Sequence, residues 1–284
     1  MKLLAALLSV LVATGAEAAP RRILFVGNSF TQGYASPAMR YRADAVTDLT
    51  GQRIGGVPAL FRTFAEQAGL DWDVFSETQG GETLRFHLER RRALIDRPWD
   101  VVVLQEYSTM GRERPGDATE YRRAATALAQ VVTRANPAVR VELMATWSRA
   151  DLVHRPGSRW SGRPIGAMAD DLAAAARAID ADSPEIDGVV PVGEAWNRAV
   201  ASGVADPNPY DGIADGRADL WSWDHYHASA AGYYLEALIV FGRVTGVDPR
   251  RLSRDERAAA DLGLSPDLAA ALQRVAAETL AATR

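Results

Sequence analysis

Apolar strand-like segments alternate with amphipathic segments along this chain. Five short segments have strand-like patterns: residues 100–105 are almost wholly apolar, for example, and residues 71–75 alternate polar with apolar residues. These five segments are residues 22–27, 71–75, 100–105, 139–145 and 186–192. Apolar positions at helical spacing predict helices between and after them, at residues 58–68, 118–135, 167–181, 233–244 and 266–282. Gly69 and Asn136-Pro137 stand where the first two helices are expected to end.

This order of elements predicts βαβ units and a mostly parallel sheet with helices on both faces. We therefore expect an α/β fold, a flavodoxin-like three-layer α/β/α sandwich with a five-stranded sheet. Ligands of such folds bind outside the carboxyl ends of the strands. The loop at residues 148–165 is too long for a plain connection, so we expect a lid or a substrate-contacting insertion there.

The first residues have the pattern of a secretory signal. Lys2 precedes an apolar run at residues 3–12, and Ala16-Glu17-Ala18 is a small-x-small cleavage site. We expect a signal peptide at residues 1–18 and a single domain at residues 19–284, located in a periplasm or secreted. Retention as an uncleaved anchor is the alternative. No later apolar segment has the length of a membrane span, so none is expected after cleavage.

Composition narrows the classes of partner and chemistry. The net charge of −4 and the pI near 5.7 argue against a nucleic-acid partner, since such proteins present a basic face. The chain has no cysteine, which excludes disulfides, thiolate metal sites and a cysteine nucleophile. A hydrophobic content of 48% is enough for a sizeable core.

A candidate nucleophile follows the first predicted strand, in Gly27-Asn28-Ser29-Phe30-Thr31. A serine between a strand end and a helix start can direct its Oγ into the ligand crevice, and its N–H can face a developing oxyanion. A helix N-cap is the alternative role for such a serine. The Gly-x-Ser-x-Gly elbow of α/β-hydrolases fits less well, because position 31 is Thr and the strand is the first one.

A candidate base and acid stand near the other end, in Asp224-His225-Tyr226-His227. A nucleophilic serine needs a base to take its proton, and the base needs an acid that fixes its tautomer. Asp224 and His227 are spaced so that the carboxylate can accept from one ring nitrogen while the other faces Ser29. A metal site made by Asp224, His225 and His227 is the alternative.

Together the two ends resemble the SGNH (GDSL-like) hydrolase and esterase family. Its opening block is Gly-Asp-Ser, with Asn tolerated in the middle, and its closing block is Asp-x-x-His. The resemblance implies a Ser29–His227–Asp224 triad that hydrolyses esters through an acyl-enzyme, with no cofactor. The family's second block supplies an oxyanion N–H, and here Gly81 in Gly80-Gly81-Glu82-Thr83 corresponds to it, with Gly80 as the alternative.

The third family block differs. The family has Gly-x-Asn-Asp, with the Asn donating to the oxyanion, whereas this chain has Gln105-Glu106-Tyr107-Ser108 after its most apolar strand. The Gln-Glu-x-Ser pattern resembles a divergent branch of the family. We expect Gln105 to donate in place of the Asn; a buried Gln bonded to backbone is the alternative. The further candidate substrate-binding residues are Asn28, Glu106, Ser108, His87 and Trp223.

The sequence therefore predicts an exported serine esterase that uses neither metal nor cofactor. Its substrate is expected to be a small-molecule or glycan ester, such as an O-acetyl group on a carbohydrate or cell-envelope polymer. One rival is an inactive SGNH-like domain that binds glycans, because the third block departs from the family. The other is a metal-dependent hydrolase built on Asp224, His225 and His227.

Overall fold

Six parallel strands form the centre of the structure, a computed structural model that describes residues 19–283. They are β1 (Arg21–Gly27), β2 (Thr47–Asp48), β3 (Trp72–Thr78), β4 (Val101–Gln105), β5 (Arg140–Ala145) and β6 (Gly188–Pro191). Their order in the sheet is β2-β3-β1-β4-β5-β6. The predicted parallel α/β sheet is confirmed, but it has six strands instead of five. The missed strand, β2, has only two residues, too few for an apolar pattern to reveal.

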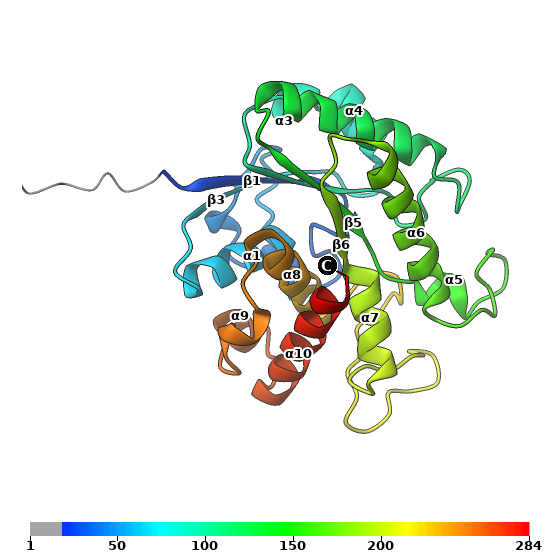
Figure 1. Cartoon of the computed structure of the whole chain (residues 1–284). Coiled ribbons are helices and arrows are strands. Elements are labelled where there is room, and N and C mark those ends of the chain that lie inside the picture. Colours follow the sequence, from blue (N-terminus) through cyan, green and yellow to red (C-terminus); the bar gives the residue numbers. More distant parts are fainter. Residues whose placement is uncertain (1–18, 284) are drawn as a thin grey trace, which may run out of the picture.

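Helices cover both faces of this sheet (Figure 1). The α-helices are α1 (Gly56–Gln67), α2 (Leu84–Arg90), α3 (Arg92–Ile95), α4 (Thr119–Ala135), α5 (Ala150–Val153), α6 (Ala167–Asp182), α7 (Val192–Ala201), α8 (Ala230–Thr245), α9 (Arg257–Asp261) and α10 (Pro266–Ala282). Short 3-10 helices occupy η1 (Pro37–Arg40), η2 (Ala43–Ala45) and η3 (Pro249–Leu252). The five helices predicted from spacing are all present, with ends shifted by at most three residues.

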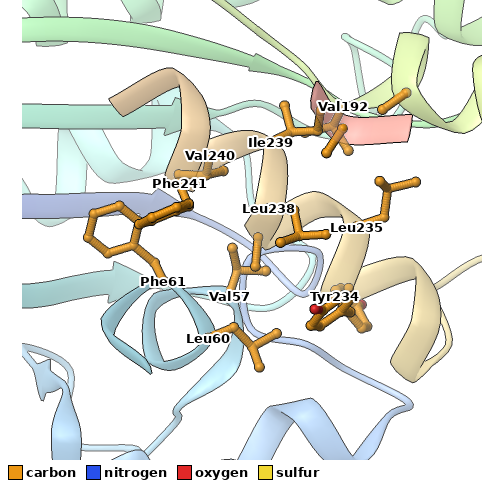
Figure 2. Packing of buried hydrophobic residues seen from close by; sticks show 14 of the residues in the cluster. Val57, Leu60, Phe61, Val192, Tyr234, Leu235, Leu238, Ile239, Val240 and Phe241 are labelled. Carbon is orange, nitrogen blue, oxygen red and sulfur yellow. The ribbon is translucent and has the colours of Figure 1, made fainter. Parts of the chain in front are cut away.

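Side chains of each strand alternate between two apolar cores. In β1, Ile23 and Phe25 belong to the core that also contains residues of α1 and α8, whereas Leu24 and Val26 belong to the core that also contains residues of α4 and α6. This alternation follows from the strand period of two, and it makes β1 apolar at every position that both layers cover. Figure 2 shows the first core, where Val57, Leu60 and Phe61 of α1 face α8. Helix α8 is buried along nearly its whole length, which explains its apolar sequence.

Five α-helices were not predicted from the apolar spacing: α2, α3, α5, α7 and α9. Of these, α3 and α9 have four and five residues, which is less than two turns and too short for apolar periodicity. Helix α7 follows β6 directly, at Val192, so the expected fifth strand ended one residue too late.

The predicted signal peptide, residues 1–18, lies outside the described residues. Within residues 19–283, no helix combines the length and the apolar character needed to cross a membrane.

Candidate active site

The turn after β1 places Ser29 at the carboxyl edge of the sheet. A Cβ at Gly27 would lie 2.5 Å from Thr31 Oγ1 and 2.7 Å from Gln105 Oε1, so only glycine fits where the strand ends. The turn is closed by the Tyr34 N–H, which donates to the Ser29 carbonyl over 3.1 Å. β1 lies between β3 and β4, so Ser29 stands where the ends of three strands meet.

The Asp224–His227 loop folds back on its own carboxylate. Asp224 Oδ1 accepts from the backbone N–H groups of Tyr226 at 3.1 Å and His227 at 2.9 Å. His225 lies between them in the left-handed region, with φ of 55°. The loop leads into α8, whose N-cap Ser229 accepts from Gly232 N. The three-residue spacing thus puts the Asp224 carboxylate beside the imidazole of His227.

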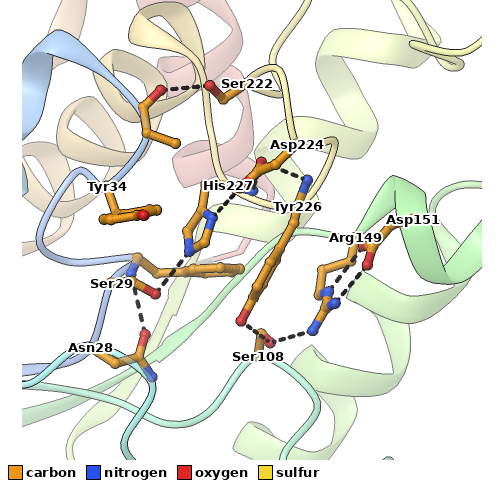
Figure 3. Close-up of polar contacts among 12 residues, drawn as sticks. Asn28, Ser29, Tyr34, Ser108, Arg149, Asp151, Ser222, Asp224, Tyr226 and His227 are labelled. Atoms are coloured by element: carbon orange, nitrogen blue, oxygen red, sulfur yellow. Dashed lines mark hydrogen bonds and ion pairs between the residues drawn. The ribbon is translucent and has the colours of Figure 1, made fainter.

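Ser29, His227 and Asp224 form one hydrogen-bonded chain (Figure 3). His227 Nδ1 lies 2.6 Å from Asp224 Oδ2, and His227 Nε2 lies 2.9 Å from Ser29 Oγ. A carboxylate can only accept, so Nδ1 carries the proton and Nε2 is left to accept from the serine hydroxyl. This is the arrangement a serine nucleophile and its base require.

The surroundings keep the base neutral and the acid ionised. Burial lowers the pKa of His227, and the Arg149 cation lowers it further, while the hydrogen bond to Asp224 raises it; the net direction is downward. Burial alone would raise the pKa of Asp224, but the hydrogen bonds from His227 and Tyr226 outweigh it and hold that pKa below its ordinary value. A neutral imidazole beside an ionised carboxylate is the resting state that general-base catalysis needs.

Aromatic rings enclose the imidazole of His227. The ring of Tyr226 lies 4.1 Å from it at 32°, and the ring of Tyr34 lies 4.8 Å from it. Phe30 contacts it edge-on at 5.6 Å and stacks on Trp147 behind. These contacts restrict the rotation of the base without using its nitrogens.

The turn that holds Gly81 lies next to the nucleophile turn. The ends of β1 and β3 are paired Gly27 to Thr78, and the Gln79 N–H donates to the Gly27 carbonyl. Gly81 has φ of +74°, which favours glycine. Among the described residues, the backbone N–H groups of Ser29 and Gly81 donate to no protein acceptor. Both are therefore available to a ligand.

The expectation that Gln105 donates to the oxyanion is corrected by its contacts. Its amide oxygen accepts from the Asn28 N–H at 2.9 Å and from Thr31 Oγ1 at 3.1 Å, and its amide nitrogen donates to the Glu106 carbonyl. Gln105 is thus the buried, backbone-bonded glutamine of the alternative interpretation, and it holds the nucleophile turn.

Asn28 is also structural instead of substrate-binding. Its amide donates to the carbonyls of Glu82 at 3.0 Å and Glu106 at 3.5 Å, and its oxygen accepts from the Phe30 N–H. The side chain is buried, so it joins the turns after β1, β3 and β4 and has no exposed face for a ligand.

His87 does not border the site. It is fully buried on α2, and its Nδ1 contacts the Glu77 carboxylate of β3. The pair joins α2 to β3, so its contribution is to fix α2 against the sheet. The expectation that His87 contacts substrate is wrong, because the sequence does not reveal that Glu77 faces the same helix.

The remaining three candidates have different surroundings. Glu106 accepts from the backbone N–H groups of Leu84 and Tyr107, and burial raises its pKa to about 8. It also lines a cavity of about 280 Å³ with Thr83.

Ser108 is buried, and its Oγ lies between Tyr226 Oη and Arg149 Nη1 (Figure 3). Trp223 is 77% exposed beside Asp224, on the rim of the site.

The sequence interpretation missed Tyr34, Arg149 and Tyr226. A signal was present for Arg149: Thr146-Trp147-Ser148-Arg149 directly follows the fourth predicted strand, at the edge where a parallel sheet binds ligands. The long loop that follows packs against the protein through buried Val153 and Trp160, and its Asp151 N–H donates to the His225 carbonyl. It therefore contacts the Asp224–His227 loop itself.

The hydrogen bonds do not favour the metal hypothesis. Both ring nitrogens of His227 are used by Ser29 and Asp224, and the ring of His225 packs against Tyr210 at 4.3 Å. In the part of the chain that the structure describes, no group of three or more His, Asp or Glu side chains is arranged as metal ligands.

Solved structures with the same fold include SGNH hydrolases. A DUF4886 family protein from Bacteroides uniformis matches with a TM-score of 0.62 at 16% identity, over 93% of this chain and 95% of that one. A candidate SGNH hydrolase from Slackia heliotrinireducens matches with a TM-score of 0.51 at 22% identity, over 80% and 100%. The chain has the SGNH hydrolase fold.

The psychrotrophic esterase EstA from Pseudoalteromonas sp. shares this SGNH-like fold, with a TM-score of 0.50 at 14% identity over 80% of this chain and 97% of that one. At such identities the likeness establishes the fold. No protein-family model and no curated protein sequence matches the chain.

Proposed function

We propose that this protein is a serine esterase with Ser29 as nucleophile, His227 as general base and Asp224 as its partner. The observation that carries the proposal is the hydrogen-bonded chain from Ser29 Oγ through both nitrogens of His227 to Asp224. A serine that only capped a helix would have no need of an imidazole at 2.9 Å whose other nitrogen meets a carboxylate. The SGNH hydrolase fold supports the same proposal.

The reaction proceeds through an acyl-enzyme. Ser29 Oγ attacks the ester carbonyl carbon as His227 Nε2 takes its proton, and the N–H groups of Ser29 and Gly81 stabilise the oxyanion. The bond to the alcohol then breaks, and the departing oxygen takes the proton from Nε2. Water, deprotonated by His227, attacks the acyl-enzyme and releases the acid, which restores Ser29.

The alcohol part of the substrate belongs on the side of His227, because Nε2 must reach the departing oxygen. Two of the three exposed large hydrophobic side chains in the described residues lie there, Tyr34 at 44% and Trp223 at 77%. Their loops are joined by the Ser222 hydroxyl, which donates to the Ala35 carbonyl over 2.6 Å (Figure 3). Open aromatic faces suit an alcohol with apolar C–H faces and outward hydroxyls, which is a sugar.

We therefore propose a glycan or cell-envelope ester with a short acyl group, such as O-acetyl, as substrate. With residues 1–18 as a signal peptide, the mature chain from residue 19 would meet such polymers in a periplasm or outside the cell.

Turnover of p-nitrophenyl acetate and of an acetylated saccharide, followed by acetate release, tests the proposal. The wild type should hydrolyse both, and Ser29→Ala and His227→Ala should reduce the rate to background. Ser202→Ala, at an exposed serine whose Oγ bonds only the Ala199 carbonyl, is the matched control. Binding of the saccharide without turnover, unchanged in Ser29→Ala, would instead establish a non-catalytic glycan-binding domain.

A further inference from the structure

Arg149 lies against the one face of Tyr226 that His227 leaves free. The guanidinium carbon is 3.6 Å from the centroid of the Tyr226 ring, and the imidazole of His227 lies 4.1 Å from the same ring (Figure 3). Tyr34 contacts the imidazole at 4.8 Å. The base therefore sits between two tyrosines, and one of these carries a cation.

The guanidinium is fixed in place by a two-pronged ion pair. Arg149 Nε donates to Asp151 Oδ1 at 3.0 Å and Nη2 donates to Asp151 Oδ2 at 2.6 Å. Nη1 makes a longer contact of 3.4 Å with Ser108 Oγ. The side chains are only 13% and 22% exposed, so solvent competes little for this geometry. A planar fork held at two points keeps the guanidinium plane against the ring.

We propose that Arg149 is a positioning residue for the catalytic base, holding the ring of Tyr226 against the imidazole of His227 so that Nε2 stays directed at Ser29. This inference rests on the proposed esterase function. A salt bridge serving only the fold would not need its cation 3.6 Å from the ring that packs on the base.

The backbone of the proposed catalytic loop, residues 224–227, is held by hydrogen bonds that do not involve the Arg149 side chain. Asp151 N–H donates to the His225 carbonyl at 3.2 Å, and Trp147 Nε1 donates to the Tyr226 carbonyl at 3.2 Å. Trp221 Nε1 donates to the Ser148 carbonyl at 2.9 Å. These contacts remain when the Arg149 side chain is changed, so variants at 149 are expected to fold with the loop in place.

The charge of Arg149 also acts on the imidazole. The charged groups that face His227 are Asp224 and Asp151, which favour its protonated form, and Arg149, which disfavours it. Tyr34 and Tyr226 also lie against the imidazole, and burial raises the pKa of Tyr226, so this ring adds no charge at physiological pH. Loss of the cation leaves Asp151 unpaired, and both changes raise the pKa of His227.

Two variants at position 149 separate the effect of the positive charge from that of the two-pronged ion pair with Asp151. Arg149→Gln removes both, so kcat/KM for p-nitrophenyl acetate should fall on the order of tenfold and the acidic limb of its pH profile should move up by about half a unit. Arg149→Lys keeps the charge without the fork, so the limb should stay while kcat/KM falls. Arg155→Gln, an exposed cation over Tyr210 on the same loop, should change neither.

Two variants at position 226 test whether Arg149 acts through the ring. Tyr226→Phe keeps the ring and should retain kcat/KM within about twofold, whereas Tyr226→Leu should lose as much as Arg149→Gln. Adding Arg149→Gln to Tyr226→Leu should then cost less than a further twofold. Fully additive losses, or Arg149→Gln with an unchanged rate and profile, would overturn the proposal.

An NMR titration of the imidazole separates this inference from the esterase proposal, since it needs no turnover. Arg149→Gln should raise the pKa of His227 and Arg149→Lys should leave it in place. If the wild type has no esterase activity and the titration still shows this pattern, the proposed function fails while the Arg149–His227 coupling stands. An unchanged His227 pKa in Arg149→Gln rejects the coupling itself.

Discussion

Asp224 holds His227 at two points: its Oδ1 accepts from the His227 backbone N–H at 2.9 Å and its Oδ2 lies 2.6 Å from Nδ1. Because each carboxylate oxygen accepts from His227, the imidazole is fixed in position and in tautomer. Asp224→Asn should leave the fold intact but allow Nδ1 to accept from the amide, which puts the proton on Nε2. We expect kcat to fall roughly 10³- to 10⁴-fold, as measured with p-nitrophenyl acetate on protein of unchanged circular dichroism. A loss below tenfold would contradict this role.

Gly81 and Gly80 offer a matched pair for the oxyanion N–H. Gly81 has φ of +74°, so Gly81→Ala strains the turn and displaces its N–H; we expect kcat to fall on the order of 10²-fold. Gly80 has no such φ, and a Cβ there meets only Gln32 Oε1 at 3.4 Å, so Gly80→Ala should be tolerated. Comparison of kcat for the two variants decides between them. The reverse order would move the oxyanion donor to Gly80.

The exposed rings beside His227 should select the alcohol. Trp223→Ala removes an aromatic face, so KM for an acetylated saccharide should rise roughly tenfold while kcat/KM for p-nitrophenyl acetate changes little. Tyr34→Ala should raise KM for the saccharide in the same way, and it should also lower kcat for both substrates, because the Tyr34 ring packs on the imidazole of His227. Ile213→Ala, at the third exposed hydrophobic residue, is the control. Steady-state kinetics with both substrates measure this. A KM that rises instead for esters of long alkyl alcohols would replace the sugar by a lipid alcohol.

Glu106 should make stability depend on pH. Its pKa in the folded protein is raised to about 8 from 4.5 by burial, so between these values the folded state binds the proton more tightly than the unfolded state. Stability must then decrease as pH rises through this window. Glu106→Gln removes this dependence, and its Tm relative to the wild type should increase from pH 5 to pH 8. Parallel Tm curves for the two proteins would contradict the raised pKa.

Residues close together in the chain were predicted well from the sequence. The apolar strands β1 and β4 and the Asp224–His227 spacing are local patterns, and the structure has them where they were expected. The short β2 was missed because it pairs with β3 at only two residues.

The errors concern partners that are distant in the chain. Gln105 looked like a donor for the oxyanion because its partner, the Asn28 N–H, is 77 positions away. His87 looked accessible because nothing local reveals that Glu77 of β3 lies against it. Arg149 and Tyr226 were missed for the same reason, since their contact exists only once β5 and the catalytic loop are side by side.

The proposed mechanism depends most directly on whether Ser29 is an activated nucleophile. Folded protein treated with a fluorophosphonate and digested for peptide mass analysis should carry the adduct on Ser29. The adduct should be absent in Ser29→Ala, strongly reduced in His227→Ala and retained in Ser202→Ala. Folded wild-type protein without an adduct on Ser29 would contradict the serine-esterase mechanism.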